Sequence, residues 1–149
     1  MLTIKQLVCG IIFKITMKSE RIFVEVFIGR QPIFNLHEQI VAYELLYRNK
    51  DSNSFPMIDS DAATVNVLIN SFVNIGIDEV TKGRPCFVSF TESILLGPLT
   101  DYLDPTKVVI EILEDVPITK ELISSIQNLK NRGFKIALDD FVLDESVHI

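Results

Sequence analysis

The sequence predicts an α/β fold with a largely parallel sheet. Helix-like and strand-like segments alternate from about Ser60 onwards, which is the pattern of consecutive βαβ units. Within this part, the segment Val108 to Leu113 is almost entirely apolar, as is typical of a parallel strand covered on both faces. The chain has 149 residues, of which 48% are hydrophobic and 23% are charged. One globular domain is therefore expected, and wholesale disorder is excluded.

The first 21 residues precede the patterned part of the chain. The apolar run from Leu7 to Phe13 is far shorter than the roughly 20 residues that a membrane helix needs. No small-residue cleavage site follows it, so a signal peptide or anchor is the less favoured alternative. We expect residues 1–21 to be an N-terminal extension that is either poorly ordered or forms an extra strand. Met17 is an alternative start of the natural chain.

The remaining elements follow in order. Residues 22–28 and 33–34 are β-rich and predict one arm of an N-terminal β-hairpin, with a break at residues 29–32. After a turn and a second arm at residues 40–47, Ser60 or Asp61 caps a helix that runs to about Ile75 and ends at Gly76. The later elements are a strand at 86–90, a helical stretch at 91–96, a strand at 108–113, a helix from Thr119 to Arg132 stopped by Gly133, and a strand at 134–138.

Charge and cysteine content exclude several classes of function. The formal net charge is -6, which disfavours binding to the phosphate backbone of nucleic acids. Cys9 and Cys86 are far apart and lack CxxC or CxxH spacing, so neither a disulfide framework nor a zinc site is expected, and a cytoplasmic location fits. No Gly-x-Gly-x-x-Gly follows any strand, so a dinucleotide-binding fold has no support.

Acidic residues fall inside or at the ends of the predicted strands. Glu44 and Glu111 lie within strands, and Asp139 and Asp140 follow the last one. In a parallel barrel the carboxyl ends of the strands converge on one mouth, where several carboxylates repel one another unless a divalent cation lies between them. The alternative is that these acids are solvated or cap the following helices. Glu111 is the most informative member, because a carboxylate within Val-Val-Ile-Glu-Ile-Leu must either point into the mouth or find a partner.

Four segments resemble, in matching order, the EAL domain, the family of cyclic di-GMP phosphodiesterases with a TIM-like barrel. They are Val26–Phe34, Val41–Arg48, Glu111–Glu114 and Ala137–Phe141. The variants Arg-Gln-Pro-Ile-Phe and Ala-Tyr-Glu-Leu-Leu-Tyr-Arg are similar to the subgroup that joins an EAL-like domain to a C-terminal HDOD domain. The resemblance implies a partial TIM-like (β/α) barrel, with residues 22–149 as an incomplete EAL-like domain.

The resemblance also implies roles for individual residues. Glu44, Glu111 and Asp139 match metal-ligand positions, and Asp140 lies next to the second metal. Gln31 and Arg48 match nucleotide-contact positions. Without the resemblance, the favoured interpretation is that Gln31 is a turn residue before Pro32 and that Arg48 is a surface charge at the end of a strand.

Departures from the family pattern argue against catalysis. Ser89 stands where an asparagine ligand is usual, and a hydroxyl is a poorer ligand for a hard dication than an amide carbonyl. Leu45, Leu113 and Val142 replace the usual alanine, threonine and glycine. A complete barrel typically needs about 250 residues, so the family's later lysine and acidic residues would lie beyond Ile149. We therefore expect no hydrolysis by this chain alone.

The expected function is a degenerate, non-catalytic EAL-like module that signals or binds proteins in bacterial cyclic di-GMP signal transduction. Two alternatives stay open: a fragment of a Mg²⁺-dependent phosphodiesterase, and a cyclic di-GMP receptor that uses Gln31 and Arg48 without chemistry. A vestigial Mg²⁺ site is expected at the acids, and neither nucleic acid nor membrane is expected as a partner. Five or six strands cannot close a barrel, so the strand at residues 134–138 is expected at an open edge, favouring self-association or a protein partner.

Overall fold

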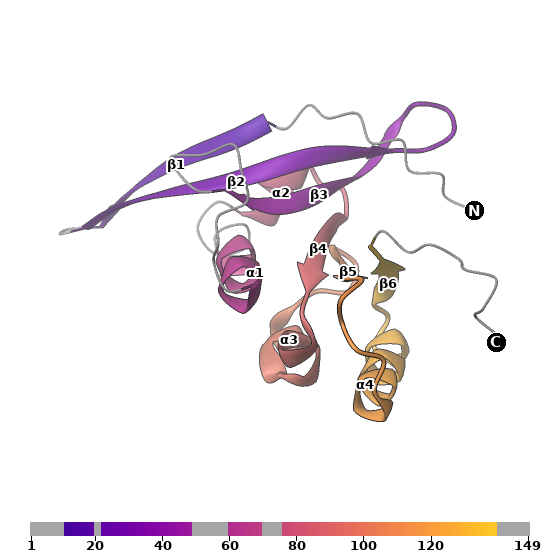
Figure 1. Cartoon of the computed structure of the whole chain (residues 1–149). Helices are drawn as coiled ribbons and strands as arrows, with labels where there is room; N and C mark the ends of the chain where they lie inside the picture. Colours follow the sequence, from indigo (N-terminus) through magenta and orange to yellow (C-terminus); the bar gives the residue numbers. More distant parts are fainter. Residues whose placement is uncertain (1–10, 20–21, 49–59, 70–75, 140–149) are drawn as a thin grey trace.

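The protein was analysed as a computed structural model that describes residues 11–19, 22–48, 60–69 and 76–139. Within these ranges, only the backbone is described for residues 11–19, 22–27, 47–48, 60, 63 and 69. The described chain forms one mixed α/β unit with a six-stranded sheet (Figure 1). The strands are β1 (Ile11–Ser19), β2 (Ile22–Phe34), β3 (Ile40–Arg48), β4 (Cys86–Phe90), β5 (Val108–Ile112) and β6 (Lys135–Leu138).

The strands lie in the sheet in the same order as in the chain. Strands β1, β2 and β3 are antiparallel neighbours, and β3, β4, β5 and β6 are parallel neighbours. Helices occupy each crossover between the parallel strands, which confirms the predicted α/β class. They are α1 (Ser60–Ile69), α2 (Ile77–Thr81), α3 (Glu92–Leu96), the 3₁₀ helix η2 (Pro98–Tyr102) and α4 (Lys120–Asn131). Within the described ranges the sheet is open, with β1 and β6 as its outer strands, and is not closed into a barrel.

One face of the sheet packs against the helices and forms the core. Every second residue of the strands points to this face, because side chains alternate along a strand. The strand residues of the core are Ile28, Tyr43, Leu45, Cys86, Val88, Phe90, Val108, Ile110 and Ile112. The helix residues are Val67, Leu68, Ile77, Val80, Ile94, Leu95, Leu122 and Leu129. Burying each large apolar side chain contributes about 1.5–3 kcal/mol.

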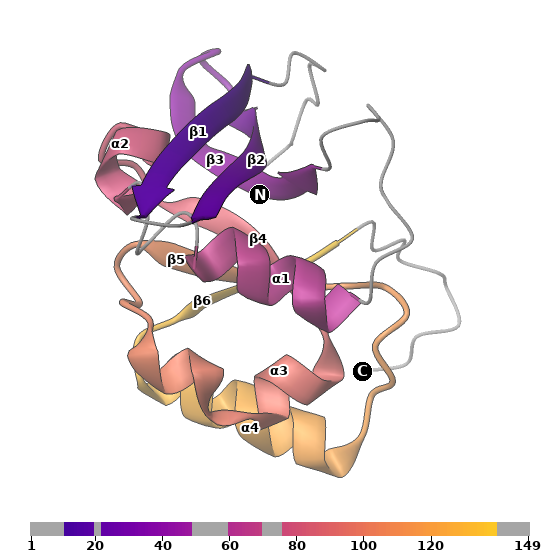
Figure 2. The ribbon, with the colours of Figure 1, turned by 90° about the vertical axis from the view of Figure 1, so that its left-hand side faces the viewer.

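Helix α4 begins and ends where the sequence predicts. The Thr119 side chain accepts a hydrogen bond of 3.1 Å from the backbone N–H of Leu122, so Thr119 is the N-cap. Gly133 has a φ of 95°, which favours glycine and ends the helix. Helices α3 and α4 are neighbours (Figures 1 and 2), and α4 also contacts β6.

The first arm of the hairpin is continuous, whereas the sequence predicted a break at residues 29–32. Arg30, Gln31 and Pro32 pair with Leu45, Glu44 and Tyr43 of β3. The backbone N–H of Tyr43 points away from β2 and donates to Pro85 O over 3.1 Å. Pro32 therefore occupies a non-hydrogen-bonded position of the antiparallel pair, where a missing N–H breaks no ladder hydrogen bond.

Two further differences concern the ends of the predicted elements. Residues 11–19 form β1, paired with β2, so the extra strand is the alternative that the structure supports for this part of the extension. Gly76, expected to end a helix, has a φ of 91° and is the N-cap of α2, an element that the sequence did not predict. Helix α1 is described to Ile69, and the rest of the predicted helix lies outside the described residues. None of the helices in the described ranges has the length and apolar character that crossing a bilayer requires.

Candidate functional site

The face of the sheet opposite the helix core carries most of the acids that the sequence singled out. Gln31 is paired with Glu44, and Glu44 with Phe87, so these side chains share one face. Ser89 is paired with Glu111 in the same way, two residues beyond Phe87. We call this surface the Glu111 face. It consists of Gln31, Ile33, Ala42, Glu44, Phe87, Ser89, Val109, Glu111, Lys135, Ala137 and Asp139.

Asp139 joins this face because it continues the β6 ladder by one residue. Its backbone N–H donates to Ile112 O over 2.9 Å, and Ala137, two residues earlier, is paired with Glu111. The alternation of side chains therefore places Ala137 and Asp139 on the same face as Glu111.

The three acids lie on a diagonal across the sheet. Glu44 is in the row of Phe87, Glu111 is one row further along the strands, and Asp139 is one row beyond Glu111. Each row advances by about 6.6 Å, since a strand rises about 3.3 Å per residue. In the part of the chain that the structure describes, no three His, Cys, Asp or Glu side chains are grouped so that they could hold a metal ion. Metal binding by Glu44, Glu111 and Asp139 stays a prediction.

Glu111 is the most deeply buried of these acids. Only 7% of its surface is exposed, and all five residues of β5 are buried. A carboxylate at this depth depends on hydrogen bonds or a cation. Glu111, Glu44 and Asp139 each take part in an interaction in the folded chain. The Ser89 side chain points to the same face from the position directly opposite Glu111.

The structure describes the two predicted nucleotide-contact residues to different extents. Gln31 is half-buried on the Glu111 face and is directly opposite Glu44 on the neighbouring strand. Arg48 ends β3, and its side chain is not among those described. Asp140 lies outside the described residues.

A polar cluster that the sequence did not predict lies just beyond the carboxyl end of β4. The carboxylate of Asp61, in the first turn of α1, accepts hydrogen bonds from the hydroxyls of Thr91 and Ser93. The hydrogen bond from Ser93 makes the largest contribution to lowering the pKa of Asp61, and the hydrogen bond from Thr91 lowers it further. Thr64 Oγ1 donates to Ser89 O over 2.8 Å. Helix α1 is thus fixed to the end of the strand that carries Ser89.

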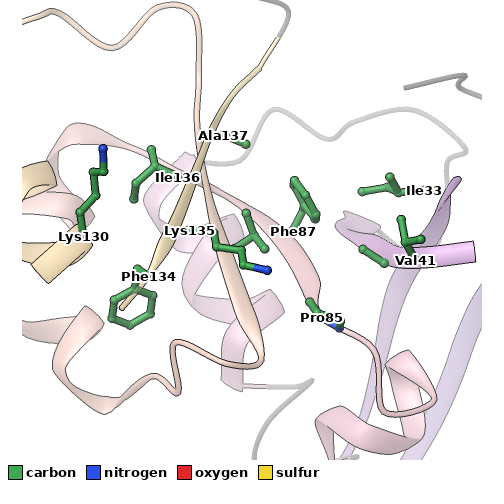
Figure 3. Close-up of a pocket in the computed structure, with 11 residues that line it drawn as sticks. Ile33, Val41, Pro85, Phe87, Lys130, Phe134, Lys135, Ile136 and Ala137 are labelled. Carbon is green, nitrogen blue, oxygen red and sulfur yellow. The ribbon is translucent and has the colours of Figure 1, made fainter. Parts of the chain in front are cut away.

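A cavity opens toward the amino-terminal ends of the parallel strands on the Glu111 face. Its volume is about 660 Å³, and its lining is largely apolar with two lysines (Figure 3). The lining residues are Ile33, Val41, Ala42, Pro85, Phe87, Val109, Lys130, Phe134, Lys135, Ile136 and Ala137. The Glu111 face therefore has an apolar part at this end and an acidic part toward the carboxyl ends.

The chain is similar to two curated proteins. It is 54% identical over 116 residues to the uncharacterized protein YuxH of Bacillus subtilis, which covers 78% of this chain and 28% of YuxH. It is 36% identical over 117 residues to the cyclic di-GMP phosphodiesterase CdgJ of Vibrio cholerae, which covers 78% of this chain and 27% of CdgJ. The matched part is thus between a quarter and a third of each relative. No family model and no solved structure matches the chain. The similarity to CdgJ points to an EAL-related region.

Proposed function

We propose that residues 22–149 are part of an EAL-type barrel and act as a non-catalytic module in cyclic di-GMP signalling. The observation that carries this proposal is the position of Ser89, which is directly opposite Glu111 on the Glu111 face. The similarity to CdgJ supports the link to cyclic di-GMP. Because the matched part is less than a third of each relative, the activity of the whole protein is likewise a proposal.

The stagger of the acids supports a barrel arrangement. Relative to the row of Glu44, Glu111 is advanced by two residues and lies two strands away. Asp139 is advanced by four residues and lies three strands away. In an eight-stranded barrel with a shear of about 8, residues at equal height advance by about one per strand. A diagonal of this slope becomes a ring at the barrel mouth, so Glu44, Glu111 and Asp139 would face one centre.

Ser89 supports the non-catalytic assignment. Carboxylate oxygens suit Mg²⁺, so Glu44, Glu111 and Asp139 would hold the ion, while the Ser89 hydroxyl supplies a weaker ligand than an amide. A bound divalent cation would polarise the phosphoryl oxygen and activate water. With a weak ligand beside Glu111, we expect a vestigial site that binds Mg²⁺ poorly.

A second candidate is hydrolysis of cyclic di-GMP. The 36% identity to a protein named as a cyclic di-GMP phosphodiesterase favours it, as do the retained acids Glu44, Glu111 and Asp139. A receptor role is the third possibility, and its proposed contacts are Gln31 and Arg48.

Turnover distinguishes these functions. The chain is incubated with cyclic di-GMP and Mg²⁺ or Mn²⁺, and the linear dinucleotide is quantified by chromatography. We expect no product above a control without protein. If the unchanged chain forms the linear dinucleotide and Glu111→Gln does not, the non-catalytic proposal is wrong and the chain acts as a phosphodiesterase.

A calorimetric titration with cyclic di-GMP separates the module from the receptor. Gln31→Ala removes the amide on the Glu111 face, and Gln127→Ala is the matched control on the exposed surface of α4. Binding that is lost only in Gln31→Ala, without turnover, would show a receptor. Heat that is equal in both variants would exclude Gln31 as a nucleotide contact.

A further inference from the structure

The pairing between β3 and β4 ends before β4 does. In the described ranges, β3 pairs with β4 at Cys86 and Phe87, whereas β5 pairs with every residue of β4. Backbone groups of successive residues in a strand point to opposite sides. The N–H of Cys86 donates to Lys107 O, immediately before β5, so the backbone groups of Phe87 and Ser89 point to the side of β3. The carbonyl of Ser89 therefore lies beyond the last pair that β3 makes.

Helix α1 supplies the hydrogen-bond donor at this position. It contacts both β3 and β4 (Figures 1 and 2). Thr64 is buried in α1, and its Oγ1 donates to Ser89 O over 2.8 Å. A helix hydroxyl thus takes the place of a strand N–H at the carboxyl end of β4. Without this donor the carbonyl would turn toward another donor or toward water, because buried backbone carbonyls are rarely left unpaired.

Asp61 extends the same contact along the chain. It lies three residues before Thr64, and residues three apart are neighbours on the surface of a helix. Its carboxylate accepts hydrogen bonds from the hydroxyls of Thr91 and Ser93. Helix α1 therefore holds three alternate residues of the segment that leaves β4, namely 89, 91 and 93.

We propose that Thr64 and Asp61 are positioning residues, which fix the backbone at residue 89 so that its side chain is directed toward Glu111. Helix α1 packs on the other face of the sheet through Val67 and Leu68, so the two residues act on the site through the backbone of β4. A rotation of the Ser89 carbonyl turns the adjoining Cα–Cβ bond as well, and with it the hydroxyl.

The consequence for metal binding rests on the proposed function, which places a weak Mg²⁺ site on the Glu111 face. Partners that orient a ligand from outside typically change metal affinity by about 10–100-fold when they are removed. Thr64 therefore sets the affinity of the site without being a ligand.

A second buried threonine provides the matched control. Thr64→Val keeps the shape of the side chain and removes the donor, whereas Thr64→Ser keeps the hydroxyl. Thr81→Val makes the same change in α2, where the buried Thr81 hydroxyl donates to Ile77 O over 2.9 Å. Each valine variant loses one buried hydrogen bond, so a general loss of stability affects both chains. An effect confined to Thr64→Val then reports the contact with β4.

Carbon-13 NMR tests the positioning without metal. The chain is labelled at the β-carbon of serine, and the Ser89 signal is identified by its loss in Ser89→Ala. We expect this signal to move in Thr64→Val and to keep its position in Thr64→Ser and Thr81→Val. Asp61→Asn leaves the Thr64 contact intact and should move the signal by a smaller amount, so the test does not depend on one variant. A signal unmoved by Thr64→Val and Asp61→Asn, or moved equally by Thr81→Val, would overturn the proposal.

Titration with MnCl₂ tests the consequence for the site. In a Ser89→Asn background, which carries the stronger amide ligand, we expect Thr64→Val to weaken Mn²⁺ binding about tenfold. Thr64→Ser and Thr81→Val should keep the affinity of that background. Equal affinities with and without Thr64→Val would overturn the control of affinity by α1. If none of these chains binds Mn²⁺, the proposed metal site is wrong, whereas the carbon-13 signal of Ser89 still supports or overturns the positioning.

Discussion

Ser89 and Glu111 are directly opposite each other on the parallel strands β4 and β5. Both side chains point to the Glu111 face, one as a hydroxyl at an intermediate depth and the other as a buried carboxylate. The pair places a weak oxygen ligand beside the most deeply buried acid of the candidate site. The ligand strength at position 89 is therefore the property that we expect to control metal affinity.

The first prediction is that Ser89→Asn strengthens binding of Mg²⁺ or Mn²⁺. An amide oxygen is a better ligand for a hard cation than a hydroxyl, and a gain of about tenfold corresponds to about 1.4 kcal/mol. The bond from Thr64 goes to the backbone oxygen of Ser89, so the substitution leaves it intact. Calorimetric titration with MnCl₂ measures the effect.

Two variants control this experiment. Ser124→Asn makes the same chemical change on the exposed surface of α4 and should leave metal affinity unchanged. Adding Glu111→Gln to Ser89→Asn should abolish the gain. Equal affinities for Ser89→Asn and Ser124→Asn would contradict the metal role of this face.

The second prediction concerns the buried Arg30 side chain, which connects β2 to α2 by a hydrogen bond. Arg30 is 5% exposed, its Nη1 donates to Val80 O over 2.6 Å, and its guanidinium lies 4.3 Å from the centre of the Tyr43 ring. Arg30→Met leaves a buried carbonyl without this donor and removes the cation–π contact, so we expect a loss of about 2–4 kcal/mol in the free energy of unfolding. Urea denaturation followed by circular dichroism measures it.

Arg84→Met is the matched control for Arg30→Met. Arg84 donates through Nε to Ile40 O over 2.9 Å, but it is exposed, so water replaces the lost bond. We expect a loss below about 1 kcal/mol for this variant. Equal losses in the free energy of unfolding for the two variants would mean that burial of Arg30 adds nothing to the contribution of its hydrogen bond.

Local patterns in the sequence predicted the parallel strands and the ends of α4, whereas contacts between distant segments could not be predicted. The apolar run of β5 and the pair Thr119 and Gly133 act through their immediate neighbours, so periodicity and capping rules suffice. The continuity of β2 depends on the side of β3 to which Tyr43 N–H points, which no local rule contains.

The candidate site divides in the same way. The acids of the Glu111 face were identified from their places in strands, and their family roles came from the resemblance. The cluster of Asp61 with Thr91 and Ser93 was missed, because 30 and 32 residues separate Asp61 from its two partners and Asp61 was interpreted as a candidate helix cap. Thr91 is at the N-cap position of α3, yet its side chain makes no capping bond there and binds Asp61.

The third prediction is that the Asp61 cluster contributes to stability at neutral pH and loses that contribution in acid. The Ser93 and Thr91 hydroxyls lower the pKa of Asp61 in the folded chain. The unfolded chain then binds the proton more readily, so the contribution is complete above the unfolded pKa and is lost as the pH falls through the folded pKa. We expect Asp61→Asn to lower the urea midpoint at pH 7 and to have little effect near pH 2.5.

Asp115→Asn controls for the loss of a carboxylate as such, since Asp115 is exposed in the loop that follows β5. Its urea midpoint should match that of the unchanged chain at both pH values. If Asp61→Asn lowers the urea midpoint by the same amount at pH 7 and pH 2.5, the contribution of the cluster does not depend on the charge of Asp61.

The last prediction concerns Cys86, whose side chain is completely buried in the core, on β4 between β3 and β5. Burial raises the pKa of this thiol to about 12, from an ordinary value of 9.0. The unfolded chain therefore loses this proton at lower pH than the folded chain. The associated stability is complete below about pH 9 and is lost as the pH rises toward 12, at up to about 1.4 kcal/mol per pH unit. We expect Cys86→Val, compared with the unchanged residue in a Cys9→Ser background, to lack this part of the alkaline decline. Because the two chains differ only at position 86, the difference between their free energies of unfolding isolates the thiol. A difference that stays constant from pH 8 to pH 11 would mean that Cys86 ionises as readily in the folded chain as in the unfolded one.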